Sequence, residues 1–437
     1  MATYDLNRSG LNHLLAADGI DPSVRAAIID YLKDDGLLSG GGKVAVQESG
    51  YPPTLDPSAQ VLLVDSSPVS IGTDPNLKVI VDIADATLKV TGSNNVLVAT
   101  GPGNDKVDMT GSSGKDVVVT GSGNDTVLGG HGADSIYGGN GNDVLVAGDG
   151  NRQLLKAGDG NDKLTGGSGN YDTMTAGDGN DTMQAGSGNY QSLKAGDGND
   201  KLTGGSGNYD TLRAGDGNDT LQAGSGNYQS LKAGDGNDKL FGGSGNYDTL
   251  RAGDGNDTLQ AGSGNYQSLK AGDGNDKLTG GSGNYDTLRA GDGNDTLQAG
   301  SGNYQSLKAG DGDDKLFGGS GNYDTLSGGG GDDSLVGGSG AHQLLEGNGG
   351  NDTLVAGSGG DTLDGGSGDD LFKVGNAGND TINGGSGHDT VDFSDSSKNA
   401  DITTHHGVTT VQFSDTGQSI KVSDVEELVF TDKSVHI

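Results

Sequence analysis

The most regular feature of the chain is an alternation of short apolar segments with glycine-rich polar segments. In its central part nine residues, AGDGNDKLT at 195–203, alternate with ten, GGSGNYDTLR. A 38-residue unit recurs unchanged at 195–232 and 271–308, and with only Phe241 in place of threonine at 233–270. Each segment predicts a loop followed by a short strand, so two segments make one 19-residue turn of a repeating structure.

Strand pleating assigns the side chains of each turn to an inner and an outer face, because successive residues point to opposite sides. The pattern predicts a thin interior of Leu202, Leu212, Leu221, Leu231, Ala214 and Ala223, with Lys201, Thr203, Arg213 and Lys232 facing solvent. The predicted fold is therefore all-β, a right-handed parallel β-roll or β-solenoid with turns of nine plus ten residues.

Apolar patterning changes along the chain and divides it into four segments. Residues 1–50 predict a small N-terminal helical cap, and 51–99 alternate apolar and polar residues as in opening turns of a solenoid before its glycine-rich loops begin. The glycine-rich repeats fill 100–392, and 393–437 return to ordinary strand alternation, which predicts a C-terminal β cap.

The helix expected near the N-terminus follows from local signals in DPSVRAAIIDYLKDDG. Asp21 is a suitable N-cap and Pro22 suits the first helical position. Apolar residues then recur on one helical face, at Val24, Ala27, Ile28 and Leu32. We interpret this helix as a cap for the end of the solenoid rather than a partner-binding helix.

Composition limits the kinds of protein this chain can be. The 437 residues include 87 glycines, no cysteine, no tryptophan and 61 acidic against 26 basic side chains, a net charge of -35. Nucleic acids and anionic membrane surfaces are poor partners for such a chain, whereas cations are good ones. No disulfide or thiolate metal site can form. An apolar run long enough for a membrane span is absent, and the first residues do not read as a classical signal peptide.

The aspartates of the repeats explain which cation is expected. Stacking identical turns places Asp200 above Asp181 and Asp219, and carboxylates about 5 Å apart repel by roughly 1 kcal/mol or more. A hard divalent cation relieves this repulsion, and glycine-rich loops expose the carbonyl oxygens that calcium prefers. Zinc would need histidine or cysteine, and His405 and His406 lie outside any ligand spacing. Folding is therefore expected to be coupled to calcium binding.

Segments such as GSGNDTVLGG at 121–130 and GGNGNDVLV at 138–146 resemble the nonapeptides of the repeats-in-toxin (RTX) family. The resemblance implies a parallel β-roll that binds several calcium ions between successive loops. It also implies type I secretion from a Gram-negative bacterium through an uncleaved C-terminal signal, and the DVEELVFTDKSVHI tail is similar to family C-termini. The aspartates that match the sixth position of the motif are the expected ligands: Asp105, Asp125, Asp134, Asp143, Asp162, Asp181, Asp200, Asp219, Asp238, Asp257, Asp276, Asp295, Asp314, Asp333, Asp352, Asp361, Asp370, Asp380 and Asp389.

The repeats depart from the family pattern in their second loop. That loop gains a tyrosine, and the residue after it alternates between aspartate and glutamine, as at Asp210, Gln229, Asp248 and Gln267. We therefore predict an asymmetric solenoid with a full row of calcium ions along the AGDGND loops and a weaker or empty row along the GNYD and GNYQ loops.

Three columns of side chains are open to more than one interpretation. The tyrosines from Tyr171 to Tyr323 either form a sugar-binding or self-association stripe or merely space the loops. The basic column either binds an acidic polysaccharide or compensates the neighbouring acidic loops; it comprises Lys194, Arg213, Lys232, Arg251, Lys270, Arg289 and Lys308. Third-position aspartates such as Asp197 and Asp216 either ligate calcium or face solvent.

The motifs of zinc proteases and serine hydrolases are absent, so we do not expect an enzyme. The sequence favours a secreted, extracellular or cell-surface calcium-binding structural protein that self-assembles as a surface-layer, filament or biofilm-matrix subunit. One alternative is a calcium-dependent surface adhesin, or a rod that binds polysaccharide or ice. The other is a secreted RTX effector that acts on host membranes.

Overall fold

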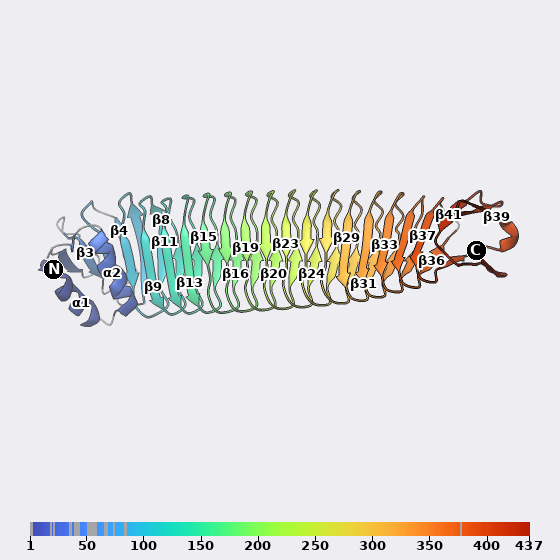
Figure 1. The fold of residues 1–437 in the computed structure, drawn as a ribbon. Coiled ribbons are helices and arrows are strands. Elements are labelled where there is room, and N and C mark those ends of the chain that lie inside the picture. Colours follow the sequence, from blue (N-terminus) through green and yellow to red (C-terminus); the bar gives the residue numbers. More distant parts are fainter. Residues whose placement is uncertain are drawn as a thin grey trace. The chain divides into compact units, whose positions relative to one another are not determined.

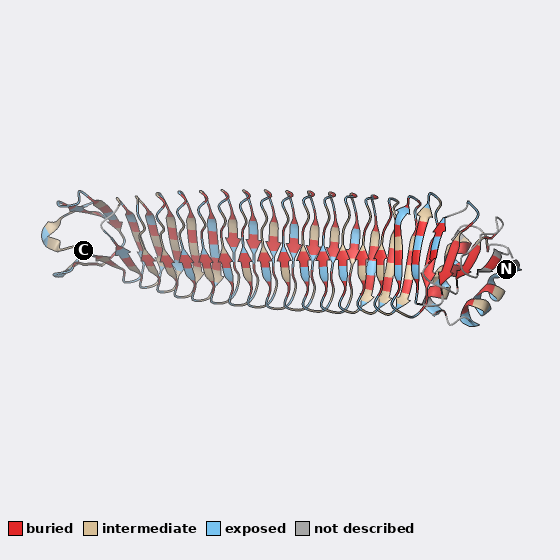
Figure 2. Cartoon of the chain, turned by 180° about the vertical axis from the view of Figure 1, so that it is seen from behind, coloured by how far each residue is buried: buried red, intermediate tan, exposed pale blue. Residues whose placement is uncertain are grey.

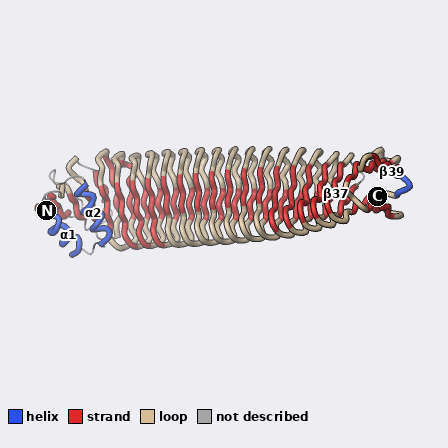
Figure 3. Tube along the Cα trace, in the orientation of Figure 1, coloured by secondary structure: helices blue, strands red, loops and turns tan. Residues whose placement is uncertain are grey.

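The structure is a computed structural model that describes residues 3–17, 20, 22–34, 37–38, 44–49, 59–64, 69–72, 75–82, 85–375 and 378–437. These residues form two compact units, Met1–Gly217 and Asn218–Ile437. Each unit is a succession of short strands joined by tight loops (Figures 1 and 3).

The elements of the first unit follow one another in this order: β1 Thr3–Leu6, α1 Arg8–Ala17, α2 Pro22–Asp34, β2 Val44–Ser49, β3 Val61–Val64, β4 Val69–Gly72, β5 Val79–Asp82, β6 Thr87–Gly92, β7 Leu97–Thr100, β8 Lys106–Ser112, β9 Val117–Ser122, β10 Thr126–Leu128, β11 Ser135–Asn140, β12 Val144–Val146, β13 Leu154–Asp159, β14 Lys163–Thr165, β15 Thr173–Thr175, β16 Thr182–Gln184, β17 Ser192–Lys194, β18 Lys201–Thr203 and β19 Thr211–Arg213.

The second unit continues with these elements: β20 Thr220–Gln222, β21 Ser230–Lys232, β22 Lys239–Phe241, β23 Thr249–Arg251, β24 Thr258–Gln260, β25 Ser268–Lys270, β26 Lys277–Thr279, β27 Thr287–Arg289, β28 Thr296–Gln298, β29 Ser306–Asp311, β30 Lys315–Phe317, β31 Thr325–Gly330, β32 Ser334–Val336, β33 Leu344–Gly349, β34 Thr353–Val355, β35 Thr362–Ser367, β36 Leu371–Val374, β37 Thr381–Ser386, β38 Thr390–Phe393, η2 Ser397–Asn399, β39 Ala400–His405, β40 Val408–Phe413, β41 Ser419–Ser423, β42 Glu427–Val429 and β43 Ser434–His436.

Within each unit the strands form two parallel stacks. In the first unit, stack A runs through β2, β3, β5, β7 and then every odd-numbered strand to β19, and stack B runs through the even-numbered strands from β4 to β18. Pairing is in register, so Leu164 of β14 lies opposite Met183 of β16, which is 19 residues later. One turn of the chain therefore adds one strand to each stack, as the repeat length predicts.

The second unit has the same two stacks, and both of them end in antiparallel strands. Stack A contains the odd-numbered strands β21 to β37, followed by β41, and stack B contains the even-numbered strands β20 to β38, followed by β42. Beyond them, β40 and β43 add antiparallel to β41 and β42. The Phe393 and Phe430 rings stack with centroids 5.0 Å apart, and Phe413 packs beside Phe393. This aromatic cluster and the change to antiparallel pairing form the C-terminal β cap.

The interior of both units is a line of leucines at the centre of three-residue strands. Leu202, Leu212, Leu221 and Leu231 are fully buried, with Ala214 and Ala223 beside them, as predicted. Figure 2 shows this buried line flanked by intermediate and exposed positions. Lys201, Arg213 and Lys232 are exposed, whereas Thr203 is half-buried rather than open to solvent. The all-β parallel solenoid is thus confirmed.

The two N-terminal helices cover part of stack A. Helix α2 begins at the predicted Pro22, and the expected N-cap Asp21 lies outside the described residues. Apolar side chains of both helices join one buried cluster with residues of β2, β3, β5 and β7, including Leu15, Ile28, Val61 and Val79. Strand β3 is consequently buried along its whole length, because the solenoid interior covers one face and the helices cover the other.

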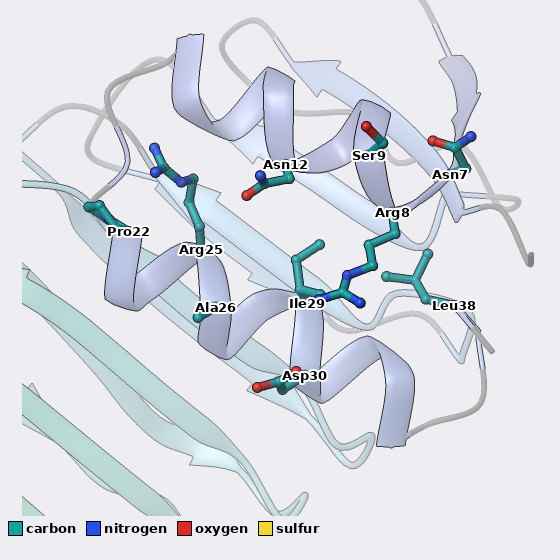
Figure 4. Close-up of a pocket in the computed structure, with 10 residues that line it drawn as sticks. All are labelled: Asn7, Arg8, Ser9, Asn12, Pro22, Arg25, Ala26, Ile29, Asp30 and Leu38. Atoms are coloured by element: carbon teal, nitrogen blue, oxygen red, sulfur yellow. The ribbon is translucent and has the colours of Figure 1, made fainter.

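The opposite side of the helices remains open to solvent. A groove between α1 and α2 is lined mainly by polar and charged side chains, among them Arg8, Asn12, Arg25 and Asp30 (Figure 4). Of the helices that the structure describes, none has the length and apolar character needed to cross a membrane. The helices are therefore amphipathic elements that complete the first unit.

Close approach between turns explains the glycines and asparagines of the loops. A Cβ atom on Gly198, whose φ is +142°, would overlap the carbonyl of Gly179 one turn earlier. The backbone N–H of Asn199 donates to Oδ1 of Asn180 over 2.7 Å. Similar asparagine bonds recur on both edges, as from Asn189 to Asn170. Loops of successive turns are thus packed backbone to backbone and linked by side-chain amides.

Candidate metal-binding edges

The loop before each stack-B strand from β8 to β38 ends in a buried aspartate, and we call this row of residues the Asp edge. In the first unit it comprises Asp105, Asp125, Asp143, Asp162, Asp181 and Asp200, and in the second Asp219, Asp238, Asp257, Asp276, Asp295, Asp314, Asp333, Asp352, Asp370 and Asp389. Asp181 donates its backbone N–H to Oδ1 of Asp200 over 2.7 Å, and Asp276 donates to Asp295 in the same way. One carboxylate oxygen therefore bonds to the backbone of the preceding turn.

In most of these aspartates the other carboxylate oxygen is buried without a hydrogen-bond partner. This holds for Oδ2 of Asp105, Asp125, Asp143, Asp162, Asp181, Asp238, Asp257, Asp276, Asp295, Asp314, Asp333, Asp352, Asp370 and Asp389. Buried polar atoms are normally hydrogen-bonded, because removing them from water is costly. A whole row of such orphaned oxygens is therefore the feature of the structure that most needs a ligand.

The electrostatics of the Asp edge agree with this conclusion. Burial raises the pKa of Asp181 to about 7, and the carboxylates of Asp200 and Asp162 also raise it. Burial likewise raises the pKa to about 7 for Asp143, Asp238, Asp295 and Asp333, and to about 6 for Asp257, Asp314, Asp352 and Asp389. The charged form of these carboxyls is disfavoured unless a cation accompanies it.

The donor set suits calcium. The orphaned carboxylate oxygens supply charge and the glycine loops supply carbonyl oxygens, which together are the hard ligands that calcium takes. Among the described residues, histidine, aspartate and glutamate side chains do not gather in groups of three or more that could hold a metal. An ion here would therefore take much of its coordination from backbone carbonyls. When bound, calcium would neutralise the buried carboxylates and bridge successive turns.

The loop before each stack-A strand from β9 to β37 forms a second row, which we call the Tyr edge. Its last residue is Asp116, Asp134, Gln153, Asp172, Gln191 and Asp210 in the first unit, and Gln229, Asp248, Gln267, Asp286, Gln305, Asp324, Gln343, Asp361 and Asp380 in the second. The expected ligands Asp134, Asp361 and Asp380 lie in this row rather than on the Asp edge. Asp134 and Asp361 differ from the Asp edge because their Oδ2 atoms accept N–H groups of Gly130 and Gly357.

Sequence reasoning left out six buried aspartates of the Tyr edge: Asp116, Asp172, Asp210, Asp248, Asp286 and Asp324. Of these, Oδ2 of Asp116 accepts from the Ser112 hydroxyl over 2.5 Å, whereas Oδ2 of the other five lacks a partner. The signal that marks them is the register: each directly precedes a strand, as the Asp-edge residues do. The extra tyrosine before five of them hid this equivalence.

The tyrosines form an exposed ladder along the Tyr edge of each unit. Their backbone is left-handed, with φ near +60°, as at Tyr266 (φ 59°), a conformation that is uncommon for a bulky residue. Rings of successive turns are almost parallel, with centroids 4.9 Å apart for Tyr266 and Tyr285. In the second unit the ladder continues from Tyr323 to His342. Ring faces are covered by neighbouring rings, so the ladder presents ring edges and hydroxyl groups to solvent.

The basic column occupies exposed positions on stack A. Arg251 and Lys270 are directly opposite each other on β23 and β25. Across the described ranges, none of the seven basic side chains of this column forms an ion pair. The expected compensation of the acidic loops therefore does not take the form of direct pairs. Asp197 and Asp216 are exposed and pair through their backbones, so their side chains face solvent.

Comparison with known proteins identifies the repeats. The family described as RTX calcium-binding nonapeptide repeat matches residues 110–145, 120–154, 146–170, 156–191, 192–209, 210–227, 230–247, 248–265, 268–285, 286–303, 309–341, 344–372 and 374–395. These segments together span more than half of the chain. No curated protein sequence matches the chain significantly. Apart from Asp105, the buried aspartates of both rows lie within the matched segments, and the chain therefore belongs to the family of RTX calcium-binding nonapeptide repeat proteins.

Proposed function

We propose that this protein is a secreted calcium-binding structural protein that folds outside the cell and then assembles with further copies of itself. It would serve as a subunit of a surface layer, a filament or a biofilm matrix. The observation that carries the proposal is the row of buried carboxylates on the Asp edge, most of which have an Oδ2 atom without a hydrogen-bond partner. Such a row is stable at neutral pH only when a cation fills the loops.

The same chemistry supports export in an unfolded state. Low calcium inside a cell would leave the buried aspartates unneutralised, so the chain would stay extended and could cross a type I channel. Millimolar calcium outside would then supply folding free energy. We propose a type I system because the chain belongs to the RTX family.

A structural role is supported by the repetition of the surface. The nine turns that carry Tyr171 to Tyr323 each present an exposed tyrosine to solvent, so one contact made between two copies can be repeated along both. We also propose that the protein is not an enzyme. On the Asp edge a buried carboxylate recurs in every turn from Asp105 to Asp389, and this repetition singles out no pair as acid and base.

Sedimentation velocity of the purified chain, first in chelator and then in millimolar calcium, tests the proposal. We expect an expanded monomer in chelator and large assemblies in calcium that chelator reverses. A chain that is already compact in chelator would overturn calcium-dependent folding. A compact monomer that never assembles at any protein concentration would overturn the self-assembly role and leave calcium-dependent folding standing.

A second candidate function is adhesion to an acidic polysaccharide, and the basic column favours it. In the second unit, Lys232, Arg251, Lys270, Arg289 and Lys308 follow one another in register on consecutive strands of stack A. Like charges on neighbouring strands repel one another. A linear polyanion laid along the column would relieve that repulsion.

Co-sedimentation with dextran sulfate in millimolar calcium tests the adhesive role. We expect the triple substitution Arg251→Ser, Lys270→Ser and Arg289→Ser to weaken binding at least tenfold. The matched control replaces Lys239, Lys277 and Lys315, which are exposed on stack B, with serine. Equal loss of binding in both variants would show that net charge rather than the column is responsible.

A further inference from the structure

The glutamines of the Tyr edge are buried and hold the loop of the preceding turn. Nε2 of Gln267 donates to the carbonyl oxygens of Gly243 and Gly245 over 3.2 and 3.1 Å. Its Oε1 accepts the N–H of Gly262 in its own loop over 2.6 Å. The side chain therefore bridges two successive loops through three hydrogen bonds.

The same arrangement recurs at other glutamines of the row. Nε2 donates to carbonyls of the loop one turn earlier in Gln153 (3.2 and 3.3 Å), Gln191 (3.4 and 3.2 Å), Gln305 (3.1 and 3.2 Å) and Gln343 (3.4 Å to Gly321). In each of them Oε1 accepts an N–H from the glutamine's own loop. The contact is thus a property of the repeat rather than of one turn.

The amide of Gln267 binds loop carbonyls that lie between two turns. Loop carbonyls and a side chain from the next turn are the groups that an ion between two turns would bridge. The glutamine Nε2 carries two N–H donors, and in Gln267 both carbonyls accept from it. It brings no charge into the loop, so these carbonyls are satisfied without an ion. We call the space between the Asp248 loop and the Gln267 loop, and its equivalents, a Gln gap.

The next space along the edge is of a different kind, and we call it an Asp gap. Between the Gln267 and Asp286 loops, Oδ1 of Asp286 accepts the N–H of Gln267 over 2.9 Å, while Oδ2 is buried without a partner. The carbonyls of Gly262 and Gly264 lie against the glycines of the Asp286 loop. A carboxylate only accepts hydrogen bonds, so this gap brings acceptor oxygens together with no side-chain donor.

The Asp gap is also isolated electrostatically. Burial, rather than a neighbouring carboxylate, raises the pKa of Asp286 to about 6. On the Asp edge, by contrast, Asp276 and Asp314 also raise the pKa of Asp295. The glutamines therefore separate the buried charges of the Tyr edge by two turns.

We propose that the Tyr edge alternates between gaps closed by a glutamine amide, which take no ion, and Asp gaps, which each take one calcium ion. This inference rests on the proposed calcium-dependent folding and specifies where its ions lie. Between Gln153 and Gln343 the Asp edge offers a site in every turn, whereas the Tyr edge offers one in every second turn. Each 38-residue repeat of the sequence then holds three ions, two on the Asp edge and one on the Tyr edge.

Native mass spectrometry of the full chain at saturating calcium counts the bound ions directly. The double variant Gln267→Asp and Gln305→Asp is expected to bind two ions more than the parent chain, because each new carboxylate opens a Gln gap. The double variant Asp248→Gln and Asp286→Gln is expected to bind two fewer. The matched control is Gln260→Asp with Gln298→Asp, which adds the same charge at exposed positions of stack B and should leave the count unchanged.

The outcomes separate this inference from the function on which it rests. The alternation would be overturned if the Gln267→Asp and Gln305→Asp variant folded and bound the same number of ions as the parent chain. It would also be overturned if this variant and the control gained the same number of ions. If that variant fails to fold, an unchanged count in Asp248→Gln and Asp286→Gln overturns it. A parent chain that is folded and binds no calcium would instead refute the proposed function.

Discussion

Without calcium, the solenoid should be most stable near pH 4 and should unfold as the pH rises towards 8. Burial raises the pKa of Asp181, Asp238, Asp295 and Asp333 from an ordinary value of 3.8 to about 7. Between these two values the folded chain keeps protons that the unfolded chain has lost. Because the folded state binds more protons there, the free energy of unfolding falls with rising pH from about pH 4 to pH 7 and stays low above it.

The size of the effect follows from the same shifts. One pKa unit corresponds to about 1.4 kcal/mol, so a shift from 3.8 to about 7 costs up to about 4 kcal/mol for each carboxyl at neutral pH. A few such groups together equal the total stability of a typical domain, about 5–15 kcal/mol. The calcium-free chain should therefore be unfolded at neutral pH.

Far-ultraviolet circular dichroism in chelator, from pH 4 to pH 8, measures this transition. We expect the β signal present near pH 4 to disappear by about pH 7.5 and to return when calcium is added at that pH. Light scattering should be recorded alongside circular dichroism, because the sequence pI is about 4.1 and a chain near its pI tends to associate. A full β signal in chelator at pH 7.5, or one lost on acidification, would refute the reasoning.

Three substitutions test the packing, each by thermal unfolding in saturating calcium. Gly274→Ala should lower the stability of the folded chain by about 1–3 kcal/mol, because φ is +139° and the new Cβ would overlap the Gly255 carbonyl. The control is Gly375→Ala, which has open space around it and should leave stability unchanged. Leu278→Ala removes a fully buried core side chain and should cost about 2–5 kcal/mol, so an unchanged midpoint would contradict a close-packed interior. Phe393→Ala opens the C-terminal aromatic cluster and should cost about 3–5 kcal/mol, with early loss of protection from hydrogen exchange in β41 and β42; uniform loss along the chain would argue against a local cap.

The solenoid could be predicted because its period is written into the chain. A leucine between polar residues, followed by glycines every nine or ten residues, specifies strand, interior and loop with no need for distant contacts. The aspartates of the Asp edge could be predicted for the same reason. Stacking of identical turns places identical residues together, so Asp181 had to lie next to Asp200.

The burial of β3 on both faces could not be assigned from pattern alone. Its VLLV stretch is compatible with a strand between two apolar layers, but the second layer comes from helices α1 and α2, whose position depends on tertiary packing. The edge on which Asp134, Asp361 and Asp380 lie was also undetermined, because nine-residue loops look alike on both edges. Only the pairing of the strands separates the two rows.

Periodicity in the sequence therefore determined the strands, the leucine interior and the row of buried aspartates, since a repeat contacts mainly its own copies. Tertiary structure decided what each repeated side chain does on its edge. Glutamine and aspartate differ little in a sequence pattern, yet Gln267 reaches back to donate to two carbonyls while Asp286 leaves a buried oxygen without a partner. That difference depends on the direction of donors and acceptors across the space between two turns, which becomes defined only when the turns are stacked.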